Sequence, residues 1–418
     1  MLENSGSSAR VAFRYPNFVL FMSARFLSGV SSEMISVAVG WQIYGLTHRP
    51  LDLGLVGLAQ FAPAVLLFLV AGHTADRHSR QRILQVCYVS FSLCALALLI
   101  LTLRGLASAW PIYAVLLANG VVRAFNGPTG QAFLPQLVAP EHFPNAVTWS
   151  SSFFQVATIL GPMVGGLIYG FTGSPIPVYC SAVVAYLVAV GLVSFIRLVL
   201  PSRPRPPASL RTILEGLRYI HRNRLILGSI SLDLFAVLLG GAVALLPIYA
   251  SEILKTGAYG LGILRAAPGA GAVLMAITLA HFPLRRHAGL AMLNCVFGFG
   301  LFTIVFGLSR NLAVSLVALV LLGSLDMVSV VVRNTLVQLA TPDEMRGRVS
   351  AVSVLFISAS NEIGQFESGI TAQWFGTVPA VVLGGLGTML IVLLWAWRFP
   401  ALRQADELVP AESRSQAT

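Results

Sequence analysis

Long apolar runs, separated by short polar connections, fill the chain from residue 17 to residue 397. A helix that crosses the hydrocarbon core of a bilayer needs about 20 predominantly apolar residues. Twelve runs are of this kind, so the pattern predicts an all-helical integral membrane protein with twelve transmembrane helices. An even number of spans places both termini on one side of the membrane. The predicted helices cover residues 17–45, 54–71, 83–103, 110–132, 147–170, 177–198, 225–249, 258–281, 289–307, 312–335, 349–371 and 377–397.

The composition also indicates that the chain is surrounded by lipid. Of its 418 residues, 56% are hydrophobic and 10% are charged, whereas soluble domains carry about 25% charged residues. The formal net charge is +11, and a strongly basic balance can indicate nucleic-acid binding. Here the basic residues are spread over many connections, which excludes a nucleic-acid interface.

The distribution of basic residues sets the orientation of the predicted helices. Twenty of them, Arg333 included, are assigned to the tails and connections of one side, and four to the other side. The side richer in Lys and Arg faces the cytoplasm, so we expect both termini to be cytoplasmic in the cell membrane. Arg25, Arg123 and Arg265 fall inside predicted helices.

The four cysteines indicate neither a disulfide nor a metal site. All of them lie within apolar runs, where cysteine acts as a small hydrophobic residue. We therefore expect no bound metal and no cofactor. The cysteines are Cys87, Cys94, Cys180 and Cys295.

A single long connection, residues 201–223, joins the sixth and seventh predicted helices. It begins with prolines among arginines, which favours an extended linker. Apolar residues then recur at helical spacing between charged ones, which predicts an amphipathic helix on the inner leaflet. A docking site for a partner is the alternative. These apolar residues are Leu210, Ile213, Leu214, Leu217 and Ile220.

The linker divides the chain into halves that repeat one another. Leu137-Val-Ala-Pro-Glu is matched by Leu339-Ala-Thr-Pro-Asp, and Pro63 is matched by Pro268. The offset is near 200 residues in each case, which indicates one duplication. Two parallel six-helix repeats form a known transporter architecture. We expect a six-helix bundle over 1–200, the linker, a second bundle over 224–400 and a cytoplasmic tail over 401–418.

Three motifs stand in a fixed order in the first half. Residues 72–80 read Gly-x-x-x-Asp-Arg-x-x-Arg, residues 123–127 read Arg-Ala-Phe-Asn-Gly, and residues 161–166 read Gly-Pro-x-x-Gly-Gly. Together they resemble the signature loop, the Arg-x-x-Gln-Gly motif and the antiporter motif of the major facilitator superfamily. The opening, with Ala-Arg-Phe at 24–26, resembles the bacterial branch that contains the enterobactin exporter and macrolide efflux proteins. Asn126 departs from the usual glutamine of the second motif.

The resemblance implies a conformational latch at the cytoplasmic side. In this family the acid of the signature loop meets the start of the eleventh helix, where a helix N-terminus attracts an anion. Thr341 is expected to cap that helix, and the second-half copy of the loop lacks an acid. The expected latch residues are Gly72, Asp76, Arg77, Arg80, Thr341 and Glu344.

Ionisable residues inside predicted spans are costly and by default functional. In this family helices 1, 4, 7 and 10 line the central cavity, and each of them carries one here: Glu33, Arg123, Asp233 and Asp326. We expect Glu33 to lie near Arg123, because a buried arginine needs a carboxylate. Structural ion pairs are the alternative. Secondary intramembrane charges are Arg25, Arg265, Glu362 and Glu367.

Glycines at four-residue spacing mark the predicted fifth helix. The pairs Gly161–Gly165 and Gly166–Gly170 allow close approach between helices, and Pro162 can kink the helix. Tight packing and a dedicated role in antiport both remain open for this motif.

These features predict a proton-coupled exporter that works by alternating access, with amphiphilic drugs, macrolides or siderophores as cargo. A net negative cavity favours protons or cationic cargo over an anionic siderophore. An importer or uniporter on the same fold is the alternative. Enzymes and ATP-driven pumps are disfavoured, because the chain has no Gly-x-x-x-x-Gly-Lys, His-Glu-x-x-His or Gly-x-Ser-x-Gly motif. The partners expected are a small-molecule substrate, protons and the bilayer, with the chain as a monomer.

Overall fold

The computed structural model of the chain describes residues 11–197, 210–282, 284 and 287–405. Within its helices, the side chains of several residues, among them those of Asp76 and Glu344, also lie outside the described part. Every regular element in these ranges is a helix, which confirms the predicted fold class.

Each of the twelve predicted runs corresponds to a long helical segment. Most of the observed helices extend beyond the apolar runs, because polar residues at the ends continue the helix. The segments are α2 (Pro16–Thr47), α3 (Pro50–Arg77), α4 (Arg80–Leu103), α5 (Trp110–Phe133), α6 (Phe143–Thr172), α7 (Ile176–Ser194), α9 (Arg224–Leu239) with its continuation, α11 (Gly257–His281), α12 (Ala288–Leu308), α13 (Leu312–Leu339), α14 (Asp343–Phe375) and α15 (Thr377–Arg398). Shorter elements are η1 (Val11–Arg14), η2 (Leu134–Gln136), η3 (Pro140–His142), α8 (Leu210–Arg222) and α16 (Pro400–Arg403).

Ten of these segments are long and apolar enough to cross a membrane by length and composition. The two others, α5 and α14, carry polar residues in mid-helix. Arg123 and Asn126 lie in α5, and Glu362 and Glu367 lie in α14. Polar groups of this kind are tolerated in a transmembrane helix when they face protein or water.

The seventh span is interrupted, although a continuous helix over 225–249 was predicted. α9 ends at Leu239, and the chain continues through η4 (Ala242–Leu245), α10 (Leu246–Ile248) and a π-helical turn, η5 (Tyr249–Ile253). The break falls at the Gly240–Gly241 pair. A Cβ atom at Gly241 would lie 2.6 Å from the carbonyl oxygen of Gly364 on α14, so the chain approaches that helix closely here.

Contacts divide the chain into two compact units. Unit 1 contains residues 1–48, 59–208 and 257–266, and unit 2 contains 49–58, 209–256 and 267–418. The units follow the two predicted halves except for two short exchanged segments. The start of α3 belongs to unit 2, and the start of α11 belongs to unit 1.

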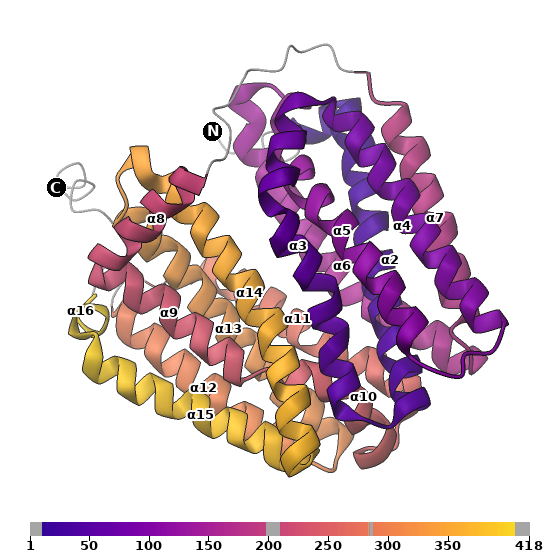
Figure 1. The fold of residues 1–418 in the computed structure, drawn as a ribbon. Helices are drawn as coiled ribbons and strands as arrows, with labels where there is room; N and C mark the ends of the chain where they lie inside the picture. The colour runs from indigo at the N-terminus through magenta and orange to yellow at the C-terminus, as the bar shows by residue number, and fades with distance from the viewer. Residues whose placement is uncertain (1–10, 198–209, 283, 285–286, 406–418) are drawn as a thin grey trace. The chain divides into compact units, whose positions relative to one another are not determined.

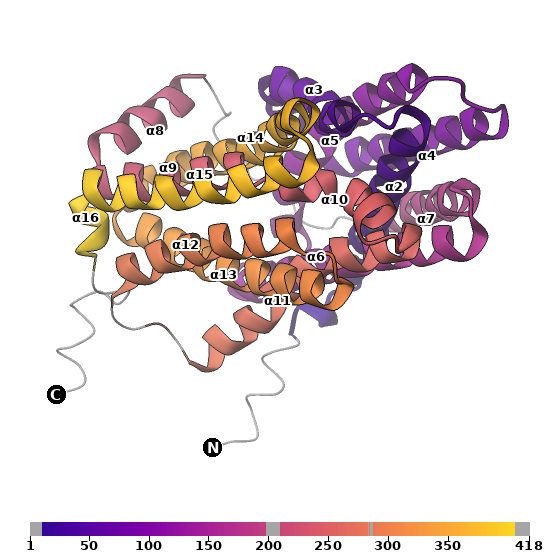
Figure 2. The same ribbon diagram turned by 90° about the horizontal axis from the view of Figure 1, so that it is seen from below.

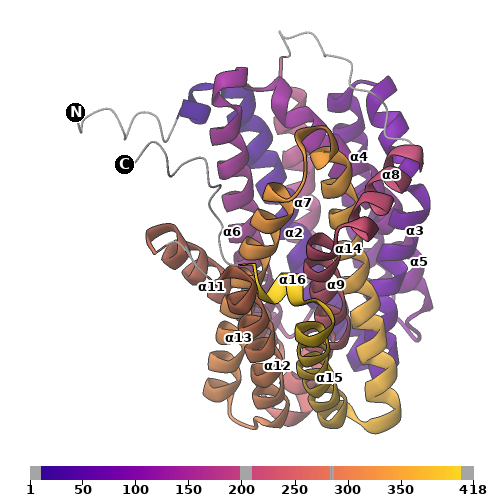
Figure 3. The ribbon, with the colours of Figure 1, turned by 90° about the vertical axis from the view of Figure 1, so that its left-hand side faces the viewer.

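The same helix pairing occurs in both units, which confirms the predicted repeat. In unit 1, α2 packs against α6 and α7, and α4 packs against α5 and α7 (Figure 1). In unit 2, α9 packs against α14 and α15, and α12 packs against α13 and α15. Figures 2 and 3 show unit 2 as two layers, with α9, α14 and α15 in one and α11, α12 and α13 in the other.

The predicted charged loop at 72–82 is almost entirely helical. α3 continues through Asp76 to Arg77, and α4 begins at Arg80, so only His78 and Ser79 connect the two helices. The polar residues next to the apolar run predict a loop, but the backbone hydrogen bonds of the helix continue through them. The hydrogen bond from the His78 amide to the carbonyl of Thr74 closes the last turn of α3.

The predicted amphipathic helix is present as α8 and packs against its own unit. Ile220 is buried in a cluster with Ile226 and Val349, and Arg348 forms an ion pair of 2.8 Å with Glu215. Leu214 and Leu217 remain exposed. The helix is therefore joined to α9 and α14 along one face, and its other face carries the leucines available for a membrane surface.

Candidate functional site

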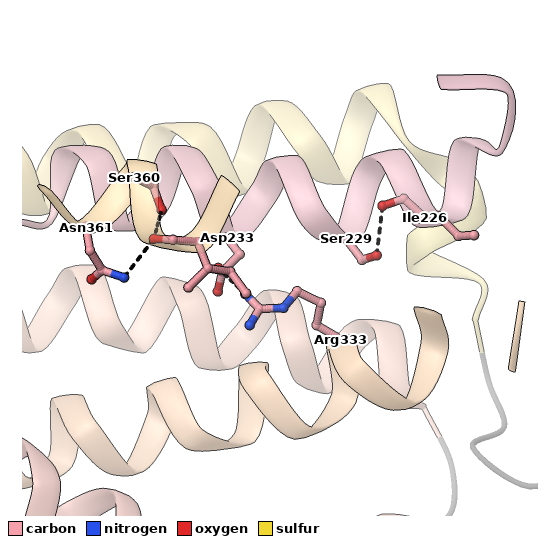
Figure 4. Close-up of polar contacts among 7 residues, drawn as sticks. Ile226, Ser229, Asp233, Arg333, Ser360 and Asn361 are labelled. Atoms are coloured by element: carbon pink, nitrogen blue, oxygen red, sulfur yellow. Dashed lines mark hydrogen bonds and ion pairs between the residues drawn. The ribbon is translucent and has the colours of Figure 1, made fainter. Parts of the chain in front are cut away.

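The central feature of unit 2 is an ion pair between two helices. Asp233 on α9 and Arg333 on α13 form it, and their side chains are 6% and 3% exposed. Figure 4 shows the arginine side chain reaching toward the carboxylate of the neighbouring helix. A buried ion pair of this kind connects the two layers of unit 2, because α9 and α13 lie in different layers.

Arg333 was wrongly assigned to a cytoplasmic connection in the count of basic residues. It lies six residues before the end of α13 and is buried. The predicted span of 312–335 already contained this position, and the buried carboxylate of Asp233 required a cation. Those two signals together would have identified the pair.

Asp326 lies on α13, seven residues before Arg333, and lines a small cavity with Asp233. The cavity measures about 10 Å³, which is room for about one water molecule. Its remaining lining consists of Ser329 on α13 and four apolar residues. The apolar residues come from α9 and α12: Ala236, Val237, Val296 and Phe299. The structure therefore brings together the two predicted second-half carboxylates, and adds an arginine and a serine that the sequence reasoning missed.

The predicted first-half pair is not formed. Arg123 on α5 donates a hydrogen bond of 2.6 Å from Nη1 to the side-chain oxygen of Gln60 on α3, and no ion pair in the described part of the chain joins it to Glu33. Arg123 is exposed rather than buried within unit 1, so an amide partner suffices and the premise of the prediction fails. Gln60 is a partner that the emphasis on charged residues overlooked.

The secondary intramembrane charges are mostly held by hydroxyl or amide groups. Arg25 donates to Ser150 Oγ at 3.1 Å, and Arg265 donates to Ser36 Oγ at 2.7 Å, both within unit 1. Neither contact includes a carboxylate. The two glutamates of α14 have partners on their own helix: Gln365 donates to Glu362 at 3.5 Å, and Thr371 donates to Glu367 at 2.7 Å.

The glycines of α6 lie at two close helix contacts. A Cβ atom at Gly165 would lie 2.8 Å from the Cα atom of Met34 on α2, and one at Gly161 would overlap the side chain of Glu33. On another side of α6, Gly166 lies against Gly262 at the start of α11. Pro162 lies within the helix, and its carbonyl oxygen would be 2.7 Å from a Cβ atom at Gly262.

The predicted latch is only partly described. Arg80 donates a hydrogen bond of 3.0 Å to the carbonyl of Ala132 at the end of α5, and Arg77 is exposed. The side chains of Asp76 and Glu344, and the position of Gly72 relative to its neighbours, lie outside the described residues.

The predicted N-cap of the eleventh helix is wrong. α14 begins at Asp343, so Pro342 occupies the capping position, with no side-chain hydrogen bond. Thr341 is buried, and its hydroxyl donates to the carbonyl of Val337 on α13, at 2.5 Å. A threonine hydroxyl can bond to the carbonyl four residues earlier instead of capping the next helix, and here that local bond is formed.

A protein-family model and named relatives match this chain over nearly its whole length. A family model described as transmembrane secretion effector matches residues 7–416. Enterobactin exporter EntS from Shigella boydii serotype 18 and from Escherichia coli O1:K1 are each 27% identical to the chain over 403 residues, which is 96% of this chain and 96% of each relative.

Solved structures of transporters share the fold. A mutant form of the nucleoside transporter NupG superposes with a TM-score of 0.73 at 12% identity, covering 92% of this chain and 100% of that chain. A bacterial homologue of the human lysosomal transporter Spinster, in an inward-facing and occupied conformation, gives 0.70 at 14% identity, covering 93% and 96%. The chain therefore belongs to the transmembrane secretion effector family and is a multi-pass transporter of the major facilitator superfamily, not an enzyme.

Proposed function

We propose that the chain exports an amphiphilic small molecule from the cytoplasm in exchange for protons, and that Asp326 carries the coupling proton. The observation that supports this most directly is the cluster in unit 2, where Asp233 is paired with Arg333 while Asp326 lines the adjacent cavity. A carboxylate that is alternately charged and neutral changes how strongly it interacts with a neighbouring cation.

The direction and the cargo rest on the relatives. Those described above are named enterobactin exporters, and the family description is one of secretion. Export of a drug, a macrolide or a siderophore follows by analogy, with both termini in the cytoplasm and the chain working as a monomer in the inner membrane. The net negative charge of the predicted cavity residues favours protons or a cationic cargo over an anionic siderophore.

Efflux from reconstituted vesicles tests the coupling. With Asp326→Asn, gradient-driven efflux of a fluorescent amphiphile is expected to be lost, while exchange of that compound at equal pH persists, because exchange needs no net proton movement. Glu141→Gln, at an exposed carboxylate in η3, is the matched control and should behave as wild type. Full gradient-driven efflux by Asp326→Asn would mean that coupling lies elsewhere.

The same vesicles separate an exporter from an importer or uniporter. An imposed inward proton gradient is expected to drive the probe out of vesicles whose protein has its cytoplasmic side facing inward. Transport at a rate independent of the proton gradient would indicate a uniporter. Gradient-driven accumulation of the probe inside the vesicles would indicate an importer.

A further inference from the structure

Three polar side chains of α13 share one face of the helix. Asp326, Ser329 and Arg333 are spaced by three and four residues, so they stand one above the other along the helix. The first two line the cavity with Asp233, and the third is paired with that same carboxylate. Ser329 thus lies between the carboxylate of its own helix and the ion pair with the neighbouring helix.

Ser329 has a hydroxyl group for which the surrounding protein supplies no partner. The residue is 1% exposed, and its Oγ has no hydrogen bond among the described residues. Two other serines of α13 differ in this respect: Ser315 donates to Ser309, and Ser324 donates to Gly271 and Val320. A buried hydroxyl without a partner is costly, so this one indicates a bound group that completes its hydrogen bonds.

The cavity beside Ser329 fits a water molecule. It has room for about one water. The polar side chains that line it are Asp233, Asp326 and Ser329, and a buried water needs about two to four polar partners. The other lining residues are apolar, so they offer no competing side-chain contacts.

We propose that Ser329 holds a water molecule in this cavity and that this water passes the coupling proton between Asp326 and Asp233. In one concerted step, the protonated carboxyl of Asp326 gives a proton to the water while the water gives one of its own to the carboxylate of Asp233. Asp326 becomes charged, Asp233 becomes neutral and the water is restored. The inference rests on the proposed function, since it assigns the path of the proton at the same site.

This transfer would act on the ion pair between the two helices. Arg333 keeps its charge because a guanidinium does not lose its proton in a protein. Once Asp233 is neutral, its attraction to Arg333 falls, and the newly charged Asp326 on α13 becomes the competing partner. Proton movement over the width of one water would therefore weaken the connection between α9 and α13.

Ser329 acts as a positioning residue, and an isosteric pair of substitutions tests this role. Ser329→Thr keeps the hydroxyl, whereas Ser329→Val has nearly the same shape without it. Ser329→Val is expected to slow gradient-driven efflux about tenfold or more, with equal-pH exchange close to wild type. Ser329→Thr, which keeps the hydroxyl, is expected to retain coupled efflux. Equal coupled efflux by the two variants would overturn the proposal.

A measurement on the wild-type protein keeps the test decisive if both variants fold poorly. A relay through water moves two protons, so the rate of gradient-driven efflux should curve downward as the D₂O fraction rises, while equal-pH exchange shows no such curvature. A linear dependence would overturn the relay.

If Asp326→Asn blocks coupled efflux but Ser329→Val does not, the relay fails and the proposed function stands; if neither blocks it, the proposed coupling site fails.

Discussion

Arg333 on α13 pairs with Asp233 on α9 in a site where the two side chains are only 3% and 6% exposed. Removing two charges from water costs several kcal/mol per ion, and their attraction offsets this cost only while both partners are present. The pair therefore adds little to the net stability of the fold. Replacing only one of its two residues is nevertheless costly, because it leaves a buried charge uncompensated.

Arg333→Leu is expected to destabilise the protein by about 3–5 kcal/mol, because it strands the Asp233 carboxylate. The double variant Asp233→Leu with Arg333→Leu should recover most of that loss. Thermal unfolding in detergent would show this order. Arg348→Leu is the control, since its pair with Glu215 is 41% and 34% exposed and should be worth about 0–1 kcal/mol. Equal destabilisation by Arg333→Leu and Arg348→Leu would contradict the assignment of a buried pair.

Glu33→Gln tests whether unit 1 contributes a second coupling carboxylate. We expect it to abolish gradient-driven efflux and to preserve exchange at equal pH. A carboxyl within a transmembrane helix can bind and release the coupling proton, whereas the amide of glutamine cannot. Glu141→Gln is the matched control, as this carboxylate is exposed and lies in η3, outside the predicted spans. Normal coupled efflux by Glu33→Gln would restrict coupling to unit 2.

Gly165→Leu should block transport by separating α6 from α2, because even a Cβ atom at this position would lie only 2.8 Å from the Cα atom of Met34. The closely packed site has no room for a leucine side chain. Gly191→Leu on α7 is the control, since no atom lies within 4 Å of a Cβ atom at that glycine. Monodispersity in detergent and efflux rate would be measured for both. A Gly165→Leu protein that transports normally would exclude a packing role for this contact.

Asp76→Asn tests the predicted latch. The variant is expected to reach the membrane in normal amounts and to change the ratio of inward-open to outward-open molecules toward inward-open, because the latch prediction relies on an anion at the start of the eleventh helix and the variant lacks that charge. Spin-label distances measured between the two units would report the ratio, with Glu141→Gln at the exposed carboxylate of η3 as the control. An unchanged ratio for Asp76→Asn would remove this residue from the latch.

The spans were predictable because each depends on the chain's own composition over about 20 residues. The apolar runs located all twelve, and the sequence repeat is reproduced by equivalent helix contacts such as α4 with α7 and α12 with α15. The break at Gly240–Gly241 was missed because the run of apolar residues continues on both sides of it, although two adjacent glycines disfavour a helix. The close approach of Gly241 to Gly364 of another helix depends on tertiary packing, which the sequence pattern does not record.

The functional site was only partly predictable, and for a similar reason. Sequence placed Asp233 and Asp326 on cavity helices, but the partner of each polar group depends on which helices touch. Arg123 was expected to need a carboxylate and has an amide, Gln60, instead. Ser329 gave no signal at all in the sequence, because a serine in an apolar helix commonly bonds to its own backbone.

The exchanged segment 257–266 sets an order for the assembly of unit 1 during synthesis. Domains generally fold as units, the N-terminal one first, yet unit 1 includes residues that follow the linker and the seventh span. Gly166 and Gly170 on α6 lie against Gly262 and Tyr259 of that segment, so this helix face stays without its partner until α11 has been inserted. A polypeptide that ends in the linker therefore lacks part of its first bundle, and the two halves depend on each other from biogenesis onward.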